Sequence, residues 1–200
     1  MFKKWETLPL KVPLTYKHAA MYVGPGLEED THRIAHAIDA GVGVPSIESI
    51  QVKFERLLPD SRLAGERCGR TVAVVIRHTD RKIAQMAAYV AEMMVHASNL
   101  PYARPGWGSL GFLRAGLGRC FVRPGGDMRL EARPVDTFCS RFVLMAFQRA
   151  LAGASQDYAA VRRALPVDAS RCSPGNIVEL AARDGAHWEK IALPEFVTCL

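Results

Sequence analysis

A cysteine and two histidines, far apart in the chain, have the residue types that nucleophilic catalysis needs. Cys139 begins an apolar segment, and His18 and His36 each stand in a short apolar segment near the start of the chain. A thiol can attack a carbonyl carbon when an imidazole within hydrogen-bond reach accepts its proton, and a further polar group can fix the tautomer of that imidazole. The three residues therefore offer a nucleophile, a base and an orienting group, provided that the fold brings them together.

The local sequence around Cys139 favours a reactive thiol. Residues 133–136 read as a loop, and apolar residues recur at helical spacing over 142–147. Cys139 is therefore expected in the first turn of a helix, with Asp136 or Thr137 as N-cap. The positive end of the helix dipole would lower the pKa of the thiol, so that a thiolate persists at mildly acidic pH. The alternative is a cysteine that only fills space in the core, a common place for free cysteine.

Two short strands must place the histidines. The segment 18–24 reads as a strand that ends in a turn rich in glycine and proline, and the segment 33–38 reads as a second strand. Together they predict a hairpin that brings the two histidines near each other on adjacent strands. A third short strand is expected over 41–45, followed by a turn or short helix from 46 to 50.

The rest of the chain reads as strands and helices that complete one core. Residues 71–77 form a β-branched run, which predicts a strand buried on both faces. Asp80 is expected to cap a helix over 81–97 that buries Ile83, Met86, Ala87, Val90, Met93 and Met94. The other expected elements are helices over 139–151, 158–165 and 174–182, the last capped by Ser173, and a final strand over 187–191.

Several short motifs stand in a particular order along the chain. They are His18 to Gly24, His36-Ala37, Gly41-Val42-Gly43-Val44, Ser46-Ile47-Glu48-Ser49, Asn99-Leu100-Pro101-Tyr102, Phe138-Cys139-Ser140, Ser173-Pro174-Gly175-Asn176 and Trp188-Glu189-Lys190-Ile191. This order resembles the permuted papain-like enzymes of the NlpC/P60 superfamily, especially the YaeF/YiiX group. That family has a His-x-x-x-Tyr-x-Gly strand first, an Ile-Glu-Ala or Ile-His-Ala strand next, and a Tyr-Cys-Ser helix late. The resemblance covers about residues 18–191.

The resemblance implies a fold and a role for each residue of the set. The fold class would be α+β, with a small antiparallel sheet packed against the helix that carries the nucleophile. Cys139 would be the nucleophile, His18 its general base, and His36 the third polar residue that orients the base. Cys139 and His18 would form a thiolate–imidazolium pair, and the Cys139 backbone N–H at the helix start would stabilise the oxyanion.

The chain also departs from the family pattern. Residues 14–17 stand where the family usually has a Gly-Asp segment, and Phe138 replaces the commoner tyrosine. Asp39 is a rival to His36 as the orienting residue, because an aspartate stabilises an imidazolium better than a neutral imidazole does. A zinc site made of His18, His36 and Cys139 would suit the ligand types, but the sequence spacing does not support it.

The remaining histidines and cysteines match no motif. His32, His78 and His187 are expected to be solvated, and His96 lies at a helix end where a cation is favoured. Five cysteines with no CxxC pair suit free thiols, and the four besides Cys139 are interpreted as bystanders: Cys68, Cys120, Cys172 and Cys199. The sequence carries no phosphate-loop pattern, so neither a cofactor nor a metal is expected.

Composition is that of one globular domain over 1–200, with an N-terminal extension over 1–17 and a Gly/Arg-rich insertion or lid over 103–134. The apolar fraction is 49%, the net charge is +6, and no apolar run is long enough to span a membrane. The arginines of the insertion could steer an acidic polymer or an anionic membrane, or simply be solvated, and nothing resembles a nucleic-acid platform. No signal peptide is apparent, so the protein is expected to be made in a cytosol.

These observations lead to a functional hypothesis with open alternatives. The hypothesis is a cysteine amidase or peptidase that acts through a thioester, most naturally on peptidoglycan peptides. Without a signal peptide, such an enzyme would suit an antibacterial effector delivered by a system such as type VI secretion, with an immunity protein as partner. The alternatives are a lipid or protein acyltransferase, a deamidase on the same Cys–His site, and a non-catalytic binding module.

Overall fold

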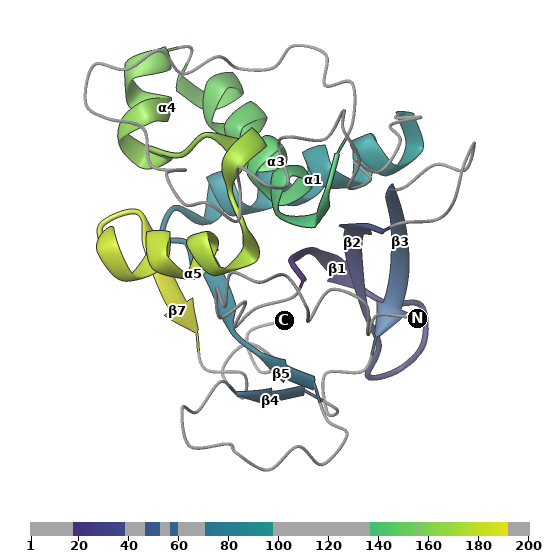
Figure 1. The fold of residues 1–200 in the computed structure, drawn as a ribbon. Helices are drawn as coiled ribbons and strands as arrows, with labels where there is room; N and C mark the ends of the chain where they lie inside the picture. Colours follow the sequence, from purple (N-terminus) through teal and green to yellow (C-terminus); the bar gives the residue numbers. More distant parts are fainter. Residues whose placement is uncertain are drawn as a thin grey trace, which may run out of the picture.

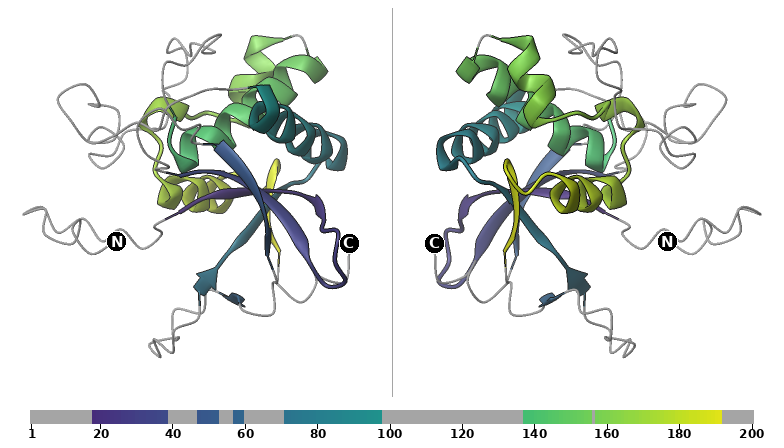
Figure 2. Two further views of the ribbon diagram at one scale, coloured as in Figure 1. Left: turned by 90° about the vertical axis from the view of Figure 1, so that its right-hand side faces the viewer. Right: turned by 90° about the vertical axis from the view of Figure 1, so that its left-hand side faces the viewer.

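The computed structural model describes six stretches of the chain. They are residues 18–38, 47–52, 57–59, 71–97, 137–155 and 157–191. Several predictions therefore lie outside the described residues: the strand over 41–45, Asp39, Asp136, the extension over 1–17 and the insertion over 103–134. Within the described stretches the fold is α+β, with the helices α1, α3 and α4 at one end of the molecule and the strands below them (Figures 1 and 2).

A three-stranded antiparallel sheet contains the predicted hairpin. Its strands are β1 (Ala20–Pro25), β2 (His32–Ala37) and β3 (Ile47–Val52), in the spatial order β1-β2-β3. The hairpin prediction is confirmed. The expectation of a turn or short helix over 46–50 is wrong for 47–50, because β3 begins at Ile47. From Ser49 to Val52 the exposed Ser49 and Gln51 alternate with the half-buried Ile50 and Val52, which is the signal of a half-buried strand.

The turn between β1 and β2 sets which residues face each other across the sheet. The Gly26 N–H donates to the Thr31 carbonyl over 2.7 Å, and the Thr31 hydroxyl donates to the Glu28 carbonyl over 2.7 Å. A Cβ at Gly26 would come within 2.0 Å of the Thr31 Oγ1, so only glycine fits this approach. A bulge between Tyr22 and Gly24 then shifts the register. As a result His36 lies opposite Ala20, two residues from His18.

Helices α1 (Arg81–Ala97) and α3 (Cys139–Ser155) pack against each other above this sheet (Figure 1). The Asp80 carboxylate accepts the Lys82 N–H over 2.8 Å, so the predicted cap of α1 is confirmed. The predicted core stripe is only partly right, because Met86 and Met93 are exposed. The buried residues of α1 are Ile83, Ala87, Ala91 and Met94. Ala87 and Ala91 are fully buried, and the Met86 sulfur lies beside Gly153 of α3 although Met86 is partly exposed.

The β-branched run over 71–77 is divided between two separate strands. β5 (Thr71–Ala73) pairs in parallel with β4 (Leu57–Pro59), and β6 (Val75–His78) pairs antiparallel with β7 (Trp188–Ile191). The expectation of burial on both faces is wrong, because the side chains from Ala73 to Arg77 are only half-buried. Among the described residues each half pairs with one strand, so neither half is interior to a larger sheet.

The C-terminal elements complete the core on the other side of α3. The predicted helices appear as α4 (Tyr158–Ala164) and α5 (Pro174–Arg183), with a short 3₁₀ helix, η3 (Ala169–Arg171), between them. Ser173 caps α5 in a capping box with Asn176, as expected from the Ser-Pro pair. Buried residues of α1, α3, α4, α5, β7 and the sheet form one continuous core cluster.

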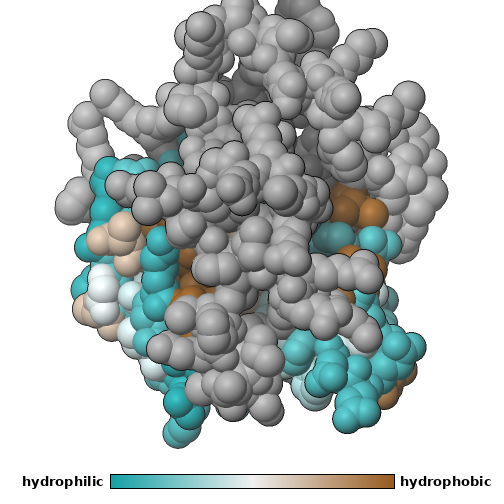
Figure 3. Space-filling model, turned by 90° about the horizontal axis from the view of Figure 1, so that it is seen from below, coloured by the Kyte–Doolittle hydropathy of each residue, from teal (hydrophilic) through white to brown (hydrophobic). Residues whose placement is uncertain are grey.

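The described helices do not include one long and apolar enough to cross a membrane. Seen from below, the described residues at the surface are mostly hydrophilic, with small hydrophobic spots between them (Figure 3). This is the surface pattern expected where the apolar side chains have gone into the core cluster.

Candidate active site

The hairpin brings His18 and His36 into direct contact. The His18 Nε2 lies 2.9 Å from the His36 Nδ1, and the two rings meet edge to face with 5.0 Å between their centroids. His36 is buried in β2, whereas His18 stands two residues before the first residue of β1, Ala20, and is exposed as a residue. The predicted proximity of the two histidines is therefore confirmed. One imidazole must donate and the other accept across this contact, because each neutral ring has one donor and one acceptor nitrogen.

A carboxylate that the sequence analysis did not single out extends this pair. The Glu48 Oε1 lies 3.1 Å from the His36 Nε2, on the side of the ring away from His18. Glu48 stands directly opposite His36 in the β2–β3 register, which explains the contact. Glu48 did not stand out in the sequence, because this segment reads there as a turn or short helix. The structure shows that the segment is a strand, in which Glu48 follows the buried Ile47. Asp39, the rival orienting residue, lies outside the described residues.

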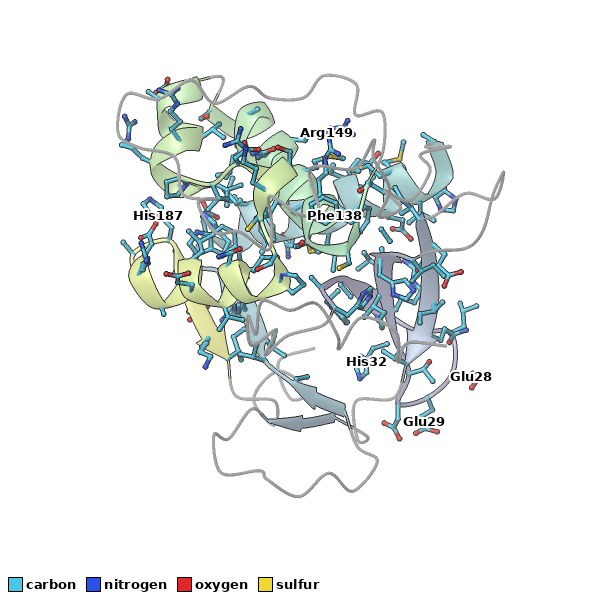
Figure 4. All side chains as sticks on the ribbon, in the orientation of Figure 1. Glu28, Glu29, His32, Phe138, Arg149 and His187 are labelled. Carbon is cyan, nitrogen blue, oxygen red and sulfur yellow. The ribbon has the colours of Figure 1, made fainter. Side chains whose placement is uncertain are left out.

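Cys139 is the first residue of α3 and is 5% exposed. The Phe142 N–H donates to the Phe138 carbonyl over 2.9 Å, so the helical hydrogen bonds begin at Phe138. Thr137 is not the N-cap: it is fully buried, and its hydroxyl donates to the Phe138 carbonyl over 3.4 Å. Phe138 marks this end of α3 in Figure 4, and the acidic turn at Glu28 and Glu29 lies at the far end of the hairpin.

The start of α3 meets the start of β1. The backbone of Ala19, the residue after His18, makes a hydrogen bond that favours the Cys139 thiolate. The next residue, Ser140, donates its hydroxyl to the Cys172 carbonyl over 2.5 Å, which ties the head of α3 to the segment before α5. The tertiary structure thus brings Cys139 next to Ala19, the neighbour of His18, although His18 and Cys139 are far apart in the chain.

The surroundings of Cys139 favour a neutral thiol rather than the expected thiolate. Burial is the largest influence, and it raises the pKa of the Cys139 thiol above its ordinary value. Hydrogen bonds from the backbone of Ala19, Ser140 and Cys139 and from the Ser140 hydroxyl act in the opposite direction but do not reverse it. The expectation of a lowered pKa is therefore wrong, because desolvation of the charged form outweighs the donors at the helix start.

The same physical effect acts on the base. Two effects lower the pKa of His18 from 6.5 to about 4. Desolvation by burial is the larger effect, and the nearby charge on His36 is the second. Although His18 is exposed as a residue, its ring lies against His36, and that contact removes solvent from one edge. A neutral imidazole and a neutral thiol are therefore the favoured resting forms. This replaces the thiolate–imidazolium pair as the starting state.

A raised thiol pKa predicts how Cys139 responds to alkylation. The rate of reaction with iodoacetamide should rise about tenfold per pH unit from about pH 6 to about pH 9, because only the thiolate reacts. Peptide mapping by mass spectrometry would follow Cys139 separately from the other cysteines. The same chain unfolded in denaturant is the control, and its rate should level off at a lower pH. A rate that is already high and flat between about pH 5 and about pH 8 would contradict the neutral thiol.

Two further histidines, His78 and His187, lie near each other, with ring centroids 6.1 Å apart. His78 is buried rather than solvated, since it is 4% exposed and packs edge-on against Trp188 with ring centroids 5.2 Å apart. Its Nδ1 accepts the Asp80 N–H over 3.1 Å, so it supports the start of α1. His187, labelled in Figure 4, is half-buried and its Nδ1 lies 2.9 Å from an Asp184 carboxylate oxygen. The prediction of solvated histidines is thus wrong for His78.

The described residues do not meet the requirements of a metal site. In the stretches that the structure describes, no group of three or more His, Cys, Asp or Glu residues is arranged to hold a metal ion. Cys172 is a buried cysteine whose thiol donates to the Ser173 carbonyl oxygen over 3.7 Å. The chain matches no family model, and no curated protein or solved structure is similar to it.

Proposed function

We propose that this protein is a cysteine amidase or peptidase with a permuted papain-like arrangement of Cys139, His18 and His36. The observation that carries the proposal is the meeting of three segments at one place. The head of α3 supplies Cys139, whose thiolate the Ala19 backbone favours by a hydrogen bond, and His18 is the residue before Ala19. β2 supplies His36, whose Nδ1 lies 2.9 Å from the His18 Nε2. Nucleophilic catalysis needs this combination of a thiol, a base beside it and a group that orients the base.

The neutral resting forms suit attack assisted by a general base. As the Cys139 sulfur bonds to the carbonyl carbon of the amide, its proton passes to His18. The backbone N–H of Cys139, unpaired within the helix because it belongs to the first turn, is the natural donor to the oxyanion. His18 then returns the proton to the leaving amine, and the C–N bond breaks to leave a thioester. A water molecule gives its proton to His18, attacks the thioester and releases the acid and the free thiol.

We infer the substrate class from the resemblance of the chain to permuted papain-like enzymes. The bond would be an amide in a peptidoglycan stem or cross-link. An enzyme with that activity would suit an antibacterial effector, and an immunity protein would be its partner. Acyl transfer to a lipid or protein, or deamidation, would use the same thiol and base, so the test below must distinguish these reactions.

The test is expression in a bacterial periplasm, with released muropeptides identified by mass spectrometry. The native chain is expected to lyse cells and to cut a defined peptide bond, whereas Cys139→Ala should do neither. Cys172→Ala is the matched control, because Cys172 is also a buried cysteine but lies outside the proposed catalytic set. Unchanged muropeptides with all three chains would reject the peptidoglycan substrate, and lipid and protein acyl substrates would then be assayed. Equal lysis by native and Cys139→Ala chains would reject the cysteine mechanism.

A further inference from the structure

We propose that Glu48 is a positioning residue that sets the tautomers of both histidines and so leaves His18 Nδ1 free to accept the Cys139 proton. The inference rests on the proposed function for the role of His18, but it concerns a residue outside the set of Cys139, His18 and His36. It is drawn from one continuous chain of contacts, in which Glu48 touches His36 and His36 touches His18.

The proton positions follow from the type of each partner. An ionised glutamate only accepts hydrogen bonds, so the His36 Nε2 beside it must carry the hydrogen and donate over 3.1 Å. A neutral His36 then has its lone pair on Nδ1. That nitrogen lies 2.9 Å from the His18 Nε2, which must therefore be the donor. The hydrogen-bond network thus assigns the hydrogen of His18 to Nε2, and its lone pair to Nδ1.

Without the carboxylate, the two histidines could be arranged in the opposite sense. His36 would carry its hydrogen on Nδ1 and donate it to His18 Nε2, and the hydrogen of His18 would lie on Nδ1. A protonated Nδ1 cannot take a proton from a thiol, so this second arrangement lacks a base. Two neutral imidazoles alone have no reason to prefer one direction of donation. Glu48 supplies the preference because it fixes the outer end of the chain of contacts.

The exposure of the residues argues for an orienting role rather than a stabilising one. The Glu48 side chain is 45% exposed and the His36 side chain is 10% exposed. A partly exposed hydrogen bond to a carboxylate adds little to folding stability, since solvent competes for it. Its effect on the buried ring is different, because the ring has few ways to satisfy its nitrogens. Glu48 is also held in place by β3, directly opposite His36 in the sheet register.

The test replaces the carboxylate with an amide of the same shape. Glu48→Gln offers an N–H₂ as well as a C=O to His36, so it permits the reversed arrangement. Glu189→Gln is the matched control, because Glu189 is another strand glutamate, 41% exposed at its side chain, that pairs with Arg77 away from the site. Protein whose histidine ring nitrogens are isotopically labelled is examined by NMR at a pH where both rings are neutral. The nitrogen signals report which nitrogen of each ring carries the hydrogen, and no substrate is needed. Alkylation of Cys139 and the steady-state kinetics are measured on the same chains.

In the native chain and in Glu189→Gln, both His18 and His36 are expected to carry hydrogen on Nε2. In Glu48→Gln a population with hydrogen on Nδ1 should appear in both rings, and kcat should fall about 10- to 100-fold with little change in KM. Alkylation of Cys139 at neutral pH should become faster in the same variant, because an N–H at His18 Nδ1 would stabilise the thiolate, which is the form that reacts. Glu48→Asp, which keeps the charge, should retain more of the native tautomer than Glu48→Gln.

Unchanged tautomers in Glu48→Gln would overturn the proposal, whatever the activity of that variant. Changed tautomers without any change in Cys139 alkylation would also overturn it, because His18 Nδ1 would then not face the Cys139 sulfur. If the tautomers and the alkylation change as expected but Cys139→Ala hydrolyses substrate like the native chain, the positioning role of Glu48 stands and the hydrolase proposal fails. The two failures are therefore distinguishable.

Discussion

Replacing His18 with alanine is expected to lower kcat/KM for amide cleavage by about 10²- to 10⁴-fold, the usual contribution of a positioned general base. The loss should be large because the thiol rests in its neutral form, so attack depends on proton removal in the same step. The measurement is the rate of peptide release from a muropeptide that the native chain cleaves. Added imidazole should restore part of the rate to His18→Ala, because a small base can enter the space that the side chain leaves.

His96→Ala is the control for the His18 substitution. His96 is an exposed histidine in the last turn of α1, and its removal should leave the rate within about twofold of native, as expected for a surface residue. A native rate in His18→Ala, together with a loss in Cys139→Ala, would show that another group is the base. A loss in His18→Ala that imidazole does not restore, with a lowered melting temperature, would point to a structural cause.

Replacing Phe142 with alanine is expected to lower the free energy of unfolding by about 3–5 kcal/mol, the range for aromatic residues removed from a core. Phe142 is 0% exposed and lies on α3 within the core cluster. Single domains are stable by only about 5–15 kcal/mol, so the variant should lose a large part of its stability. The measurement is urea unfolding followed by circular dichroism, with the midpoint and the slope fitted separately.

Arg149→Ala is the control on the same helix. Arg149, labelled in Figure 4, is exposed on α3, and surface substitutions usually change stability by less than about 0.5 kcal/mol. The difference between the two variants isolates the burial of the phenyl ring from the helix propensity of alanine. A loss of less than about 1 kcal/mol in Phe142→Ala would mean that the core near the head of α3 closes over the space.

Much of the secondary structure was predictable because it depends on local patterns. The hairpin followed from two short apolar segments around a turn rich in glycine and proline, and the structure confirms it. The caps of α1 and α5 followed from Asp80 and Ser173, whose short polar side chains satisfy backbone N–H groups at a helix start. The helix predicted over 139–151 followed from its apolar periodicity, and in the structure it continues to Ser155.

The errors arose where the outcome depends on distant partners. Met86 and Met93 fit the helical stripe of α1 but are partly exposed, because the contact that the folded chain makes with this helix buries Ile83, Ala87, Ala91 and Met94. The β-branched run over 71–77 divides between two sheets because its halves pair with β4 and β7. Neither contact leaves a signal in the local sequence, since each is a property of two surfaces that meet.

The amino-acid sequence by itself determined which chemistry this protein has to offer: one cysteine at the head of a helix, and two histidines that the hairpin turn places on adjacent strands. The tertiary structure alone decided how these groups are tuned. Burial raised the pKa of Cys139 against the pull of the helix start, and desolvation next to His36 lowered the pKa of His18. The strand register brought in Glu48, which no spacing to His18 or Cys139 suggested. The physical reason is that residue types and short periods are local, whereas solvent exclusion and hydrogen-bond partners depend on what the folded chain brings alongside.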